Sequence, residues 1–264
     1  MATFYNEARK NSMKTWFLLS FFSLLLIATG WGLSFAFGDI TILYIAVIFA
    51  VISSFISYWK SDKIVLAMSN AKEAPEKDYP DIHNIVENLA ISEGLPKPKI
   101  YIINEDQPNA FATGRNPEHG VIAVTKGLLD RLDKSETEAV IAHELAHIKN
   151  RDVLVSTIAV VFAGAISIAS RIFLRSLIFG RGRRSNNSNG NGNALMLIIG
   201  IIVAILAPIF AVMIRLAISR KREYLADSSA ILNTRYPDGL ASALEKISSH
   251  PKELKAANDA TANL

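Results

Sequence analysis

The sequence predicts an α-helical membrane protein with an α+β domain at the bilayer surface. Half of the 264 residues are hydrophobic, and the mean hydropathy is +0.26. The apolar residues are concentrated in four long runs, which predicts four transmembrane helices. Between the second and third runs, residues 61–152 have the composition of soluble protein and mix helix-like with strand-like patterns.

The first two runs predict a transmembrane hairpin over residues 1–60. Residues 16–37 contain no charged side chain over 22 positions, and residues 40–59 follow after only Gly38 and Asp39. Each run has the ~20 residues that an α-helix needs to cross about 30 Å of hydrocarbon. Neither run has a polar face, which argues against a pair of buried core helices. The first run is also too long for a signal-peptide core, and no small-residue cleavage site follows it.

Basic residues predict the orientation of this hairpin. The turn between the two helices carries no basic residue, whereas five flank the outer ends: Arg9, Lys10, Lys14, Lys60 and Lys63. The positive-inside rule therefore places the N-terminus and the chain after residue 59 on the cytoplasmic side. Because the basic residues cluster beside apolar runs, the net charge of +4 indicates a lipid bilayer as partner and not nucleic acid.

Residues 61–152 predict the first part of a catalytic domain. Residues 80–95 keep apolar side chains at helical spacing between a proline and a glycine, which predicts an amphipathic helix. Three short strands are predicted at 98–104, 109–114 and 120–127, and the last two are joined by the turn-forming sequence RNPEH.

The stretch VIAHELAHIKNRD lies on the next predicted helix. In the sequence SETE, Ser135 and Glu138 predict a capping box with Ser135 as the N-cap. His143 and His147 then project from one face of the helix, so both imidazoles can bind one metal ion. Glu144 lies at the neighbouring edge of that face, where it can take a proton from an attacking water. The alternative is a pair of ordinary histidines on a helix surface.

This spacing is the His-Glu-x-x-His arrangement of zinc metalloproteases, in which zinc lowers the pKa of bound water to about 7. The chain contains no cysteine, which excludes a disulfide framework and thiolate ligands. A third ligand must therefore be histidine, aspartate or glutamate. The three other histidines, His83, His119 and His250, lie in sequences that do not suggest metal ligation.

The sequence SRKREYLADSSA, residues 219–230, offers a third ligand. Glu223 and Asp227 lie four residues apart on a predicted helix. Glu223 can complete a His2Glu site for one Zn²⁺ per chain, and Asp227 can accept a hydrogen bond from the free nitrogen of His143. Without the histidine helix, these two acids would be interpreted as a solvated charged face.

Residues 153–218 predict a second transmembrane hairpin. Residues 153–170 and 194–214 carry no charge, and between them the basic, Gly/Asn/Ser-rich loop 180–193 is predicted to be disordered. If both segments span, this basic loop lies outside, against the positive-inside rule. A hairpin that is only partly embedded in the bilayer is the alternative.

Together, AVIAHELAHIKNRD, NAFATG and SRKREYLADSSAI resemble the HtpX-type membrane-embedded zinc metalloproteases, relatives of the CAAX prenyl protease. The resemblance covers essentially the whole chain. It implies a gluzincin-like α+β zinc protease domain whose edge strand binds extended substrate through Asn109, Ala110, Phe111 and Ala112. It also implies a stress-response protease of the bacterial cytoplasmic (inner) membrane, with its active site facing the cytoplasm, that cleaves misfolded or damaged membrane proteins. Family members usually continue past AANDATANL, so residues 219–264 are expected to be a C-terminally truncated second part of the catalytic domain.

Two other functions are compatible with parts of this pattern. A non-enzymatic scaffold or transporter subunit could carry a regulatory metal site, but a transporter is expected to place ionisable residues or broken helices within its spans. The first, second and fourth runs lack charge. An inactive relative of the proteases is disfavoured because His143, Glu144, His147 and Glu223 are all present.

Overall fold

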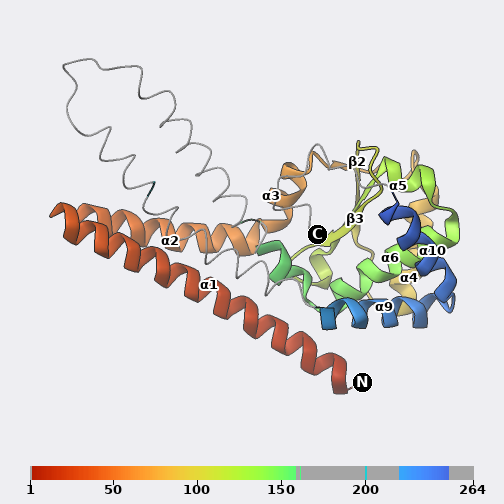
Figure 1. The fold of residues 1–264 in the computed structure, drawn as a ribbon, viewed down its shortest axis with the longest axis horizontal. Coiled ribbons are helices and arrows are strands. Elements are labelled where there is room, and N and C mark those ends of the chain that lie inside the picture. Colours follow the sequence, from red (N-terminus) through yellow and green to blue (C-terminus); the bar gives the residue numbers. More distant parts are fainter. Residues whose placement is uncertain (1, 159–160, 162–199, 201–219, 250–264) are drawn as a thin grey trace, which may run out of the picture.

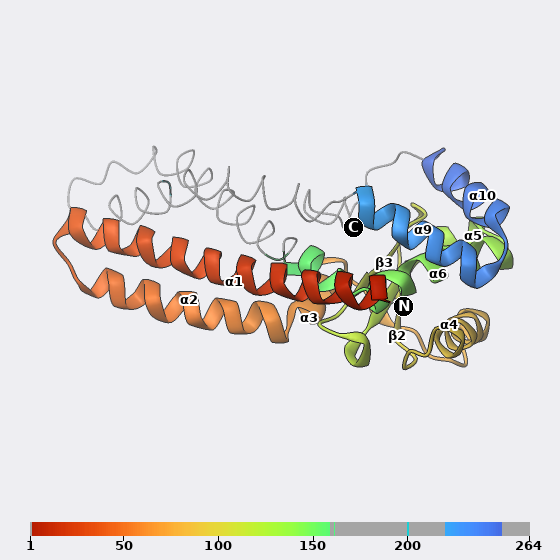
Figure 2. The ribbon, with the colours of Figure 1, turned by 90° about the horizontal axis from the view of Figure 1, so that it is seen from below.

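The computed structural model describes residues 2–158, 161, 200 and 220–249. Two long helices, α1 (Ala2–Phe37) and α2 (Thr41–Trp59), lie side by side and extend away from an α+β domain (Figure 1, Figure 2). Most of the predicted second hairpin, its loop 180–193 and residues 250–264 lie outside the described residues.

The α1–α2 pair has the length and composition of a transmembrane hairpin. The candidate spans are Arg9–Phe35 and Thr41–Trp59, which are long and apolar enough to cross a membrane. Most of their apolar surface is exposed, unlike that of a helix in the core of a soluble domain. The structure thus has two candidate membrane helices where the sequence predicts the first hairpin.

Small residues let α1 and α2 approach each other closely. A Cβ atom added at Gly30 would lie 2.2 Å from the Cβ of Ala46, so only glycine fits at this crossing. The Oγ atoms of Ser23 and Ser54 lie 2.7 Å apart and form a hydrogen bond between the helices. Gly38 adopts a φ of 67° and turns the chain from one helix into the other.

The domain after the hairpin contains a four-stranded mixed sheet in the order β1-β2-β4-β3. Strand β4 pairs in parallel with β2 and antiparallel with β3, whereas β1 pairs antiparallel with β2. Strand β3 is therefore an edge strand. The strands are β1 (Lys72–Glu73), β2 (Lys99–Ile103), β3 (Ala110–Thr113) and β4 (Val121–Thr125). The last three coincide with the predicted strands, and β1 was not predicted.

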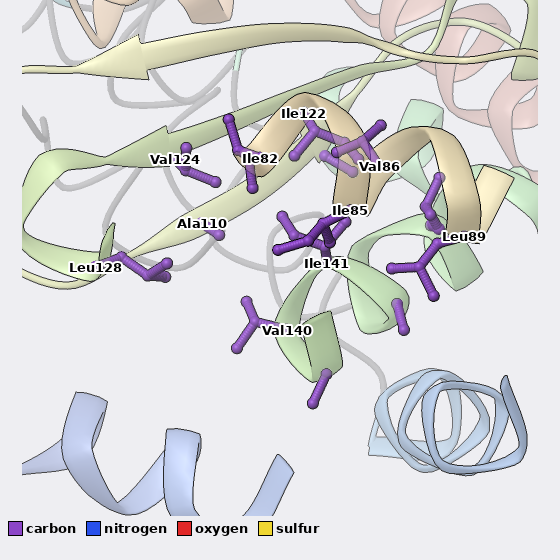
Figure 3. Packing of buried hydrophobic residues seen from close by; sticks show 14 of the residues in the cluster. Ile82, Ile85, Val86, Leu89, Ala110, Ile122, Val124, Leu128, Val140 and Ile141 are labelled. Atoms are coloured by element: carbon purple, nitrogen blue, oxygen red, sulfur yellow. The ribbon is translucent and has the colours of Figure 1, made fainter. Parts of the chain in front are cut away.

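Side chains alternate between the two faces of this sheet. On one face, Ile122 and Val124 of β4 pack with Ile85 and Ile141, which come from α4 (Pro80–Glu93) and α6 (Lys134–Lys149) (Figure 3). The predicted helix 80–95 is confirmed, and it ends at Gly94 in a left-handed conformation. The other face packs on α3 (Ser61–Met68), which was not predicted.

The start of α6 differs from the prediction. Asp133, not Ser135, is the N-cap, and its side chain accepts a hydrogen bond from the backbone N–H of Glu136. The Glu136 carboxylate closes the capping box and also binds Ser242 and Lys246 of α10 (Pro237–Ser248), at 2.5 and 2.7 Å. The helix thus begins where its first turn also meets α10. The short helices η1 (Pro117–His119) and α5 (Lys126–Arg131) complete this region.

The helical conformation is interrupted at the end of α6. The helix ends at Lys149, and Arg151 adopts a left-handed φ of 54°. Helical structure resumes at 153–158, so α6 does not run straight into the following apolar segment, as a continuous zinc-binding membrane helix would require. Asn11 of α1 stabilises this interruption of the helix, because its side-chain amide donates a 3.1 Å hydrogen bond to the backbone carbonyl of Asn150.

Candidate metal centre

Helices α6 and α9 (Arg220–Thr234) bring three ligand-type side chains together. The Nε2 atoms of His143 and His147 lie 3.1 Å apart. Oε2 of Glu223 lies 3.6 Å from the first of these nitrogens and 3.7 Å from the second. The ligand atoms of all three groups lie within 4.8 Å of one another. Among the described residues, these three side chains form the one group of histidines and acids close enough to hold a metal ion. Neighbouring ligand atoms in a tetrahedral zinc site with bonds of about 2.0–2.1 Å lie about 3.3 Å apart, so these distances fit zinc.

Each histidine ring has a carboxylate behind it. Oδ1 of Asp227 lies 2.9 Å from Nδ1 of His143, an ion-pair contact whose angles depart from those of a well-aligned hydrogen bond. Both oxygens of Asp152 lie 3.1–3.2 Å from Nδ1 of His147. These carboxylates favour the tautomer in which Nδ1 carries the proton and Nε2 is left for a metal. The sequence pattern had already indicated the Asp227 pairing, whereas it did not identify Asp152.

Without a metal, the charges of the site favour protonated rings. Burial opposes the charge on His147, but the hydrogen bond and negative charge of Asp152 outweigh it and raise the pKa of His147 to about 9. Burial likewise opposes the charge on His143, yet its contacts with Glu223 and other nearby acids raise the pKa of His143. The nearby ring of His143 in turn lowers the pKa of Glu223. A site that attracts protons in this way also attracts a divalent cation, and the donor set His2Glu suits zinc.

Glu144 stands between the histidines and the sheet edge. Burial raises the pKa of its carboxyl group, while the two histidines and the backbone N–H of Ala112 act in the opposite direction. A carboxylate with a raised pKa is suited to accept a proton near neutral pH.

Within the described residues, the outer edge of β3 beside Glu144 pairs with no further strand. The carbonyl of Asn109 accepts a 2.9 Å hydrogen bond from the backbone N–H of Thr125, so the main chain of Asn109 faces β4. Because backbone direction alternates along a strand, the N–H and C=O groups of Ala110 and Ala112 face away from β4. Phe111 turns its side chain to the opposite face of the sheet, among the residues around α3.

The remaining histidines take no part in this cluster within the described residues. His83 contacts the backbone carbonyl of Ala74 at 3.0 Å, and His119 contacts Asn116 and Arg115 in the β3–β4 connection. His250 lies outside the described residues.

Comparison with known proteins places the chain in a family. The model of peptidase family M48 matches residues 76–261. A protease HtpX homolog of Thermoanaerobacter pseudethanolicus is 45% identical over 99% of this chain and 88% of that protein. A second, of Dictyoglomus turgidum, is 44% identical over 99% of this chain and 85% of its own length. A third, of Aquifex aeolicus, is 48% identical over 83% of this chain and 73% of that protein.

Among solved structures, the crystal structure of S. mikatae Ste24p aligns with a TM-score of 0.48 and 17% sequence identity. The alignment covers 100% of this chain and 64% of that protein. The family match and the three bacterial relatives carry the assignment, and they agree with the HtpX-type resemblance of the motifs. The chain therefore belongs to peptidase family M48, whose members are zinc-dependent metallopeptidases.

Proposed function

We propose that this chain is a membrane-bound zinc endopeptidase that binds one Zn²⁺ through His143, His147 and Glu223. The observation that carries the proposal is the position of this cluster beside the unpaired edge of β3. Asp152 accepts the Nδ1 proton of His147, and the charge of Asp227 beside Nδ1 of His143 favours the same tautomer, so both Nε2 atoms are available as ligands. Zinc, when bound there, supplies a Lewis acid that polarises the scissile carbonyl.

The substrate is an extended peptide that adds to the sheet as a further strand. The outward N–H and C=O of Ala110 and the C=O of Ala112 supply the main-chain hydrogen bonds for this pairing, while the N–H of Ala112 contacts Glu144. The main chain of Asn109 is committed to β4, so only its side-chain amide is available to a peptide. Phe111 contributes by packing β3 against the domain and not by touching substrate.

Glu144 is the catalytic residue among the protein's own groups. Its carboxylate removes a proton from the attacking water and delivers that proton to the amine that leaves when the C–N bond breaks. The contact between Glu144 and the N–H of Ala112 places the base directly beside the peptide-binding edge.

The membrane hairpin supports a role in the quality control of membrane proteins. The domain begins directly after α2, so the cluster is tethered to a candidate membrane helix. Residues 153–218 contribute the second hairpin of a four-helix membrane part, and residues 61–152 and 219–264 form the two parts of the catalytic domain on the cytoplasmic side. Misfolded or damaged membrane proteins, whose loops lie at the inner-membrane surface, are the substrates.

A comparison of the wild type with Glu144→Gln tests this function. We expect the purified chain in detergent to cleave an unfolded model protein when zinc is added, and the variant to lose at least about 10²-fold in rate. The variant should still bind zinc, because Glu144 is not a ligand. Glu138→Gln makes the same change on the same helix outside the cluster and should retain wild-type activity. Equal rates for wild type and Glu144→Gln with zinc bound would reject the assigned role.

A further inference from the structure

A buried ion pair connects the metal centre to the helix that bears the third ligand. Asp152 is 3% exposed, and one of its oxygens, Oδ2, lies 3.1 Å from Nδ1 of His147. The same oxygen lies 3.8 Å from Nε of Arg222 on α9. Arg222 directly precedes Glu223 in the chain. One carboxylate therefore touches both a histidine ligand and the residue beside the carboxylate ligand.

The burial of Arg222 needs an explanation. Its side chain is 9% exposed, and its two terminal nitrogens are buried without a hydrogen-bond partner in the described part of the chain. Burying a guanidinium is costly unless an opposite charge accompanies it. A carboxylate that only oriented His147 would not require a buried arginine. The arrangement instead requires Asp152 and Arg222 to be present together.

We propose that Asp152 and Arg222 are a pair of positioning residues that set the placement of Glu223 relative to His147. This inference rests on the proposed zinc site. Asp152 fixes the orientation of the His147 ring, and Arg222 attaches the first turn of α9 to that same carboxylate. The two helices that supply the ligands are thus held in register by a contact that does not pass through the metal. Neither residue touches the substrate or the reacting atoms.

The consequence is a coupled energetic effect on metal binding. Removing Asp152 leaves a buried guanidinium without its counter-charge, and removing Arg222 leaves Asp152 attached to His147 alone. Each single loss therefore carries the cost of the partner left behind, which the loss of both residues removes. The effects of the two substitutions on zinc affinity should be less than multiplicative when combined.

A double-mutant cycle on the full-length chain in detergent tests the pair. The variants are Asp152→Asn, Arg222→Met and the double variant, and the measurements are the zinc dissociation constant by chelator competition, the visible spectrum with Co²⁺ in the site, and kcat and KM. Each single variant should weaken zinc binding by about 10- to 100-fold, alter the Co²⁺ spectrum and reduce kcat more than it raises KM. The double variant should bind zinc more tightly than the product of the two single effects predicts.

Two further variants separate positioning from general damage. Arg220→Met removes an exposed arginine from the same helix and should bind zinc like the wild type. Arg222→Lys retains the cation and should recover most of the affinity lost in Arg222→Met. If Asp152→Asn does not fold, the comparison of Arg222→Met with Arg222→Lys tests the same contact from α9.

Two outcomes would overturn the pair: strictly multiplicative single effects, or zinc affinity and a Co²⁺ spectrum in Arg222→Met that match those of the wild type. Failure of the wild type itself to bind zinc or to cleave would instead reject the proposed function. The two failures are therefore distinguishable in one set of measurements.

Discussion

Oδ1 of Asp227 lies 2.9 Å from Nδ1 of His143, while Glu223, one turn earlier on α9, faces Nε2 of the same ring. A single helix thus contacts both nitrogens of one histidine through two different carboxylates. Glu223 is placed to share a metal with the ring, and Asp227 is placed to orient it. Truncating either residue should weaken metal binding, but for different reasons and to different extents.

We expect Asp227→Ala to retain zinc with an affinity reduced by about 10- to 100-fold, because the ring of His143 loses its orienting partner. Glu223→Ala should lose more, because a ligand is removed. Chelator competition at fixed pH measures both constants. Asp238→Asn, at the start of α10, is a control for charge loss outside the centre. The order of the two effects would contradict the assignment if Asp227→Ala were the more damaging change.

Zinc binding should strengthen as the pH rises toward 9. Zinc binds the neutral imidazole, whereas the metal-free protein holds a proton on His147 up to a pKa of about 9. Below that value each binding event must release this proton, so the apparent affinity should increase by about tenfold per pH unit and by more if His143 also releases one. Isothermal titration in buffers of different ionisation enthalpy counts the protons. An affinity independent of pH between 7 and 9 would contradict the raised pKa.

The same pKa predicts opposite stability profiles for the metal-free and zinc-loaded protein. The folded-state pKa of His147 lies above the ordinary value of 6.5, so the contact with Asp152 stabilises the metal-free protein fully below pH 6.5. That contribution should be lost as the pH rises through about 9. With zinc in excess, tighter binding should instead increase stability over this range. Thermal unfolding in detergent, with and without zinc, measures the difference.

Strand β3 offers a test of peptide binding that leaves the metal untouched. Ala110→Pro removes an outward N–H without removing any hydrogen bond to β4, and it leaves the contact of Ala112 with Glu144 in place. We expect kcat/KM for an unfolded substrate to fall by at least about tenfold, the effect of losing a hydrogen bond and about 1.4 kcal/mol. Ala110→Gly keeps the N–H and serves as the matched variant. Zinc affinity should be unchanged in both, which separates an effect on substrate from an effect on the ligands.

Two glycines of α1 provide a matched pair of substitutions that tests how closely α1 and α2 pack. Gly30→Ala would place its Cβ 2.2 Å from that of Ala46, whereas a Cβ at Gly32 meets nothing within 4 Å. Gly30→Ala should therefore separate α1 from α2, and Gly32→Ala should be neutral or slightly stabilising. Cysteines at Ser23 and Ser54, whose oxygens are in hydrogen-bond contact, report the separation in a chain that otherwise lacks cysteine. Equal rates of disulfide formation in both glycine variants would contradict the close crossing.

The sequence patterns predicted the elements whose signals are local. Apolar periodicity and a terminal glycine located α4, and hydrophobic runs between turn residues located β2, β3 and β4. The start of α6 was misplaced because both Asp133 and Ser135 are followed three residues later by glutamate, so either fits a capping box. The contact of Glu136 with Lys246 lies 110 residues away in the chain and could not be recognised locally.

The position of Asp152 in the site is a second feature that local sequence patterns could not predict. On a continuous helix, a residue five positions after His147 would lie about 140° around the axis and would point away from it. The left-handed conformation of Arg151 redirects the chain and brings the carboxylate behind the ring. Fixed helical spacing located His143, His147, Glu223 and the pairing of Asp227. A side chain positioned by a break in the helix could not be located from spacing alone.

The hydrogen bond from Asn11 to the carbonyl of Asn150 has a consequence for biogenesis. These residues are separated by 139 positions, and Asn11 is 2% exposed. During synthesis, the first helix emerges and enters the membrane long before its partner residue exists. Its buried amide can be satisfied only after α6 has been made and has folded back against it. The earliest segment to leave the ribosome thus reaches this contact only after the end of α6 has been made.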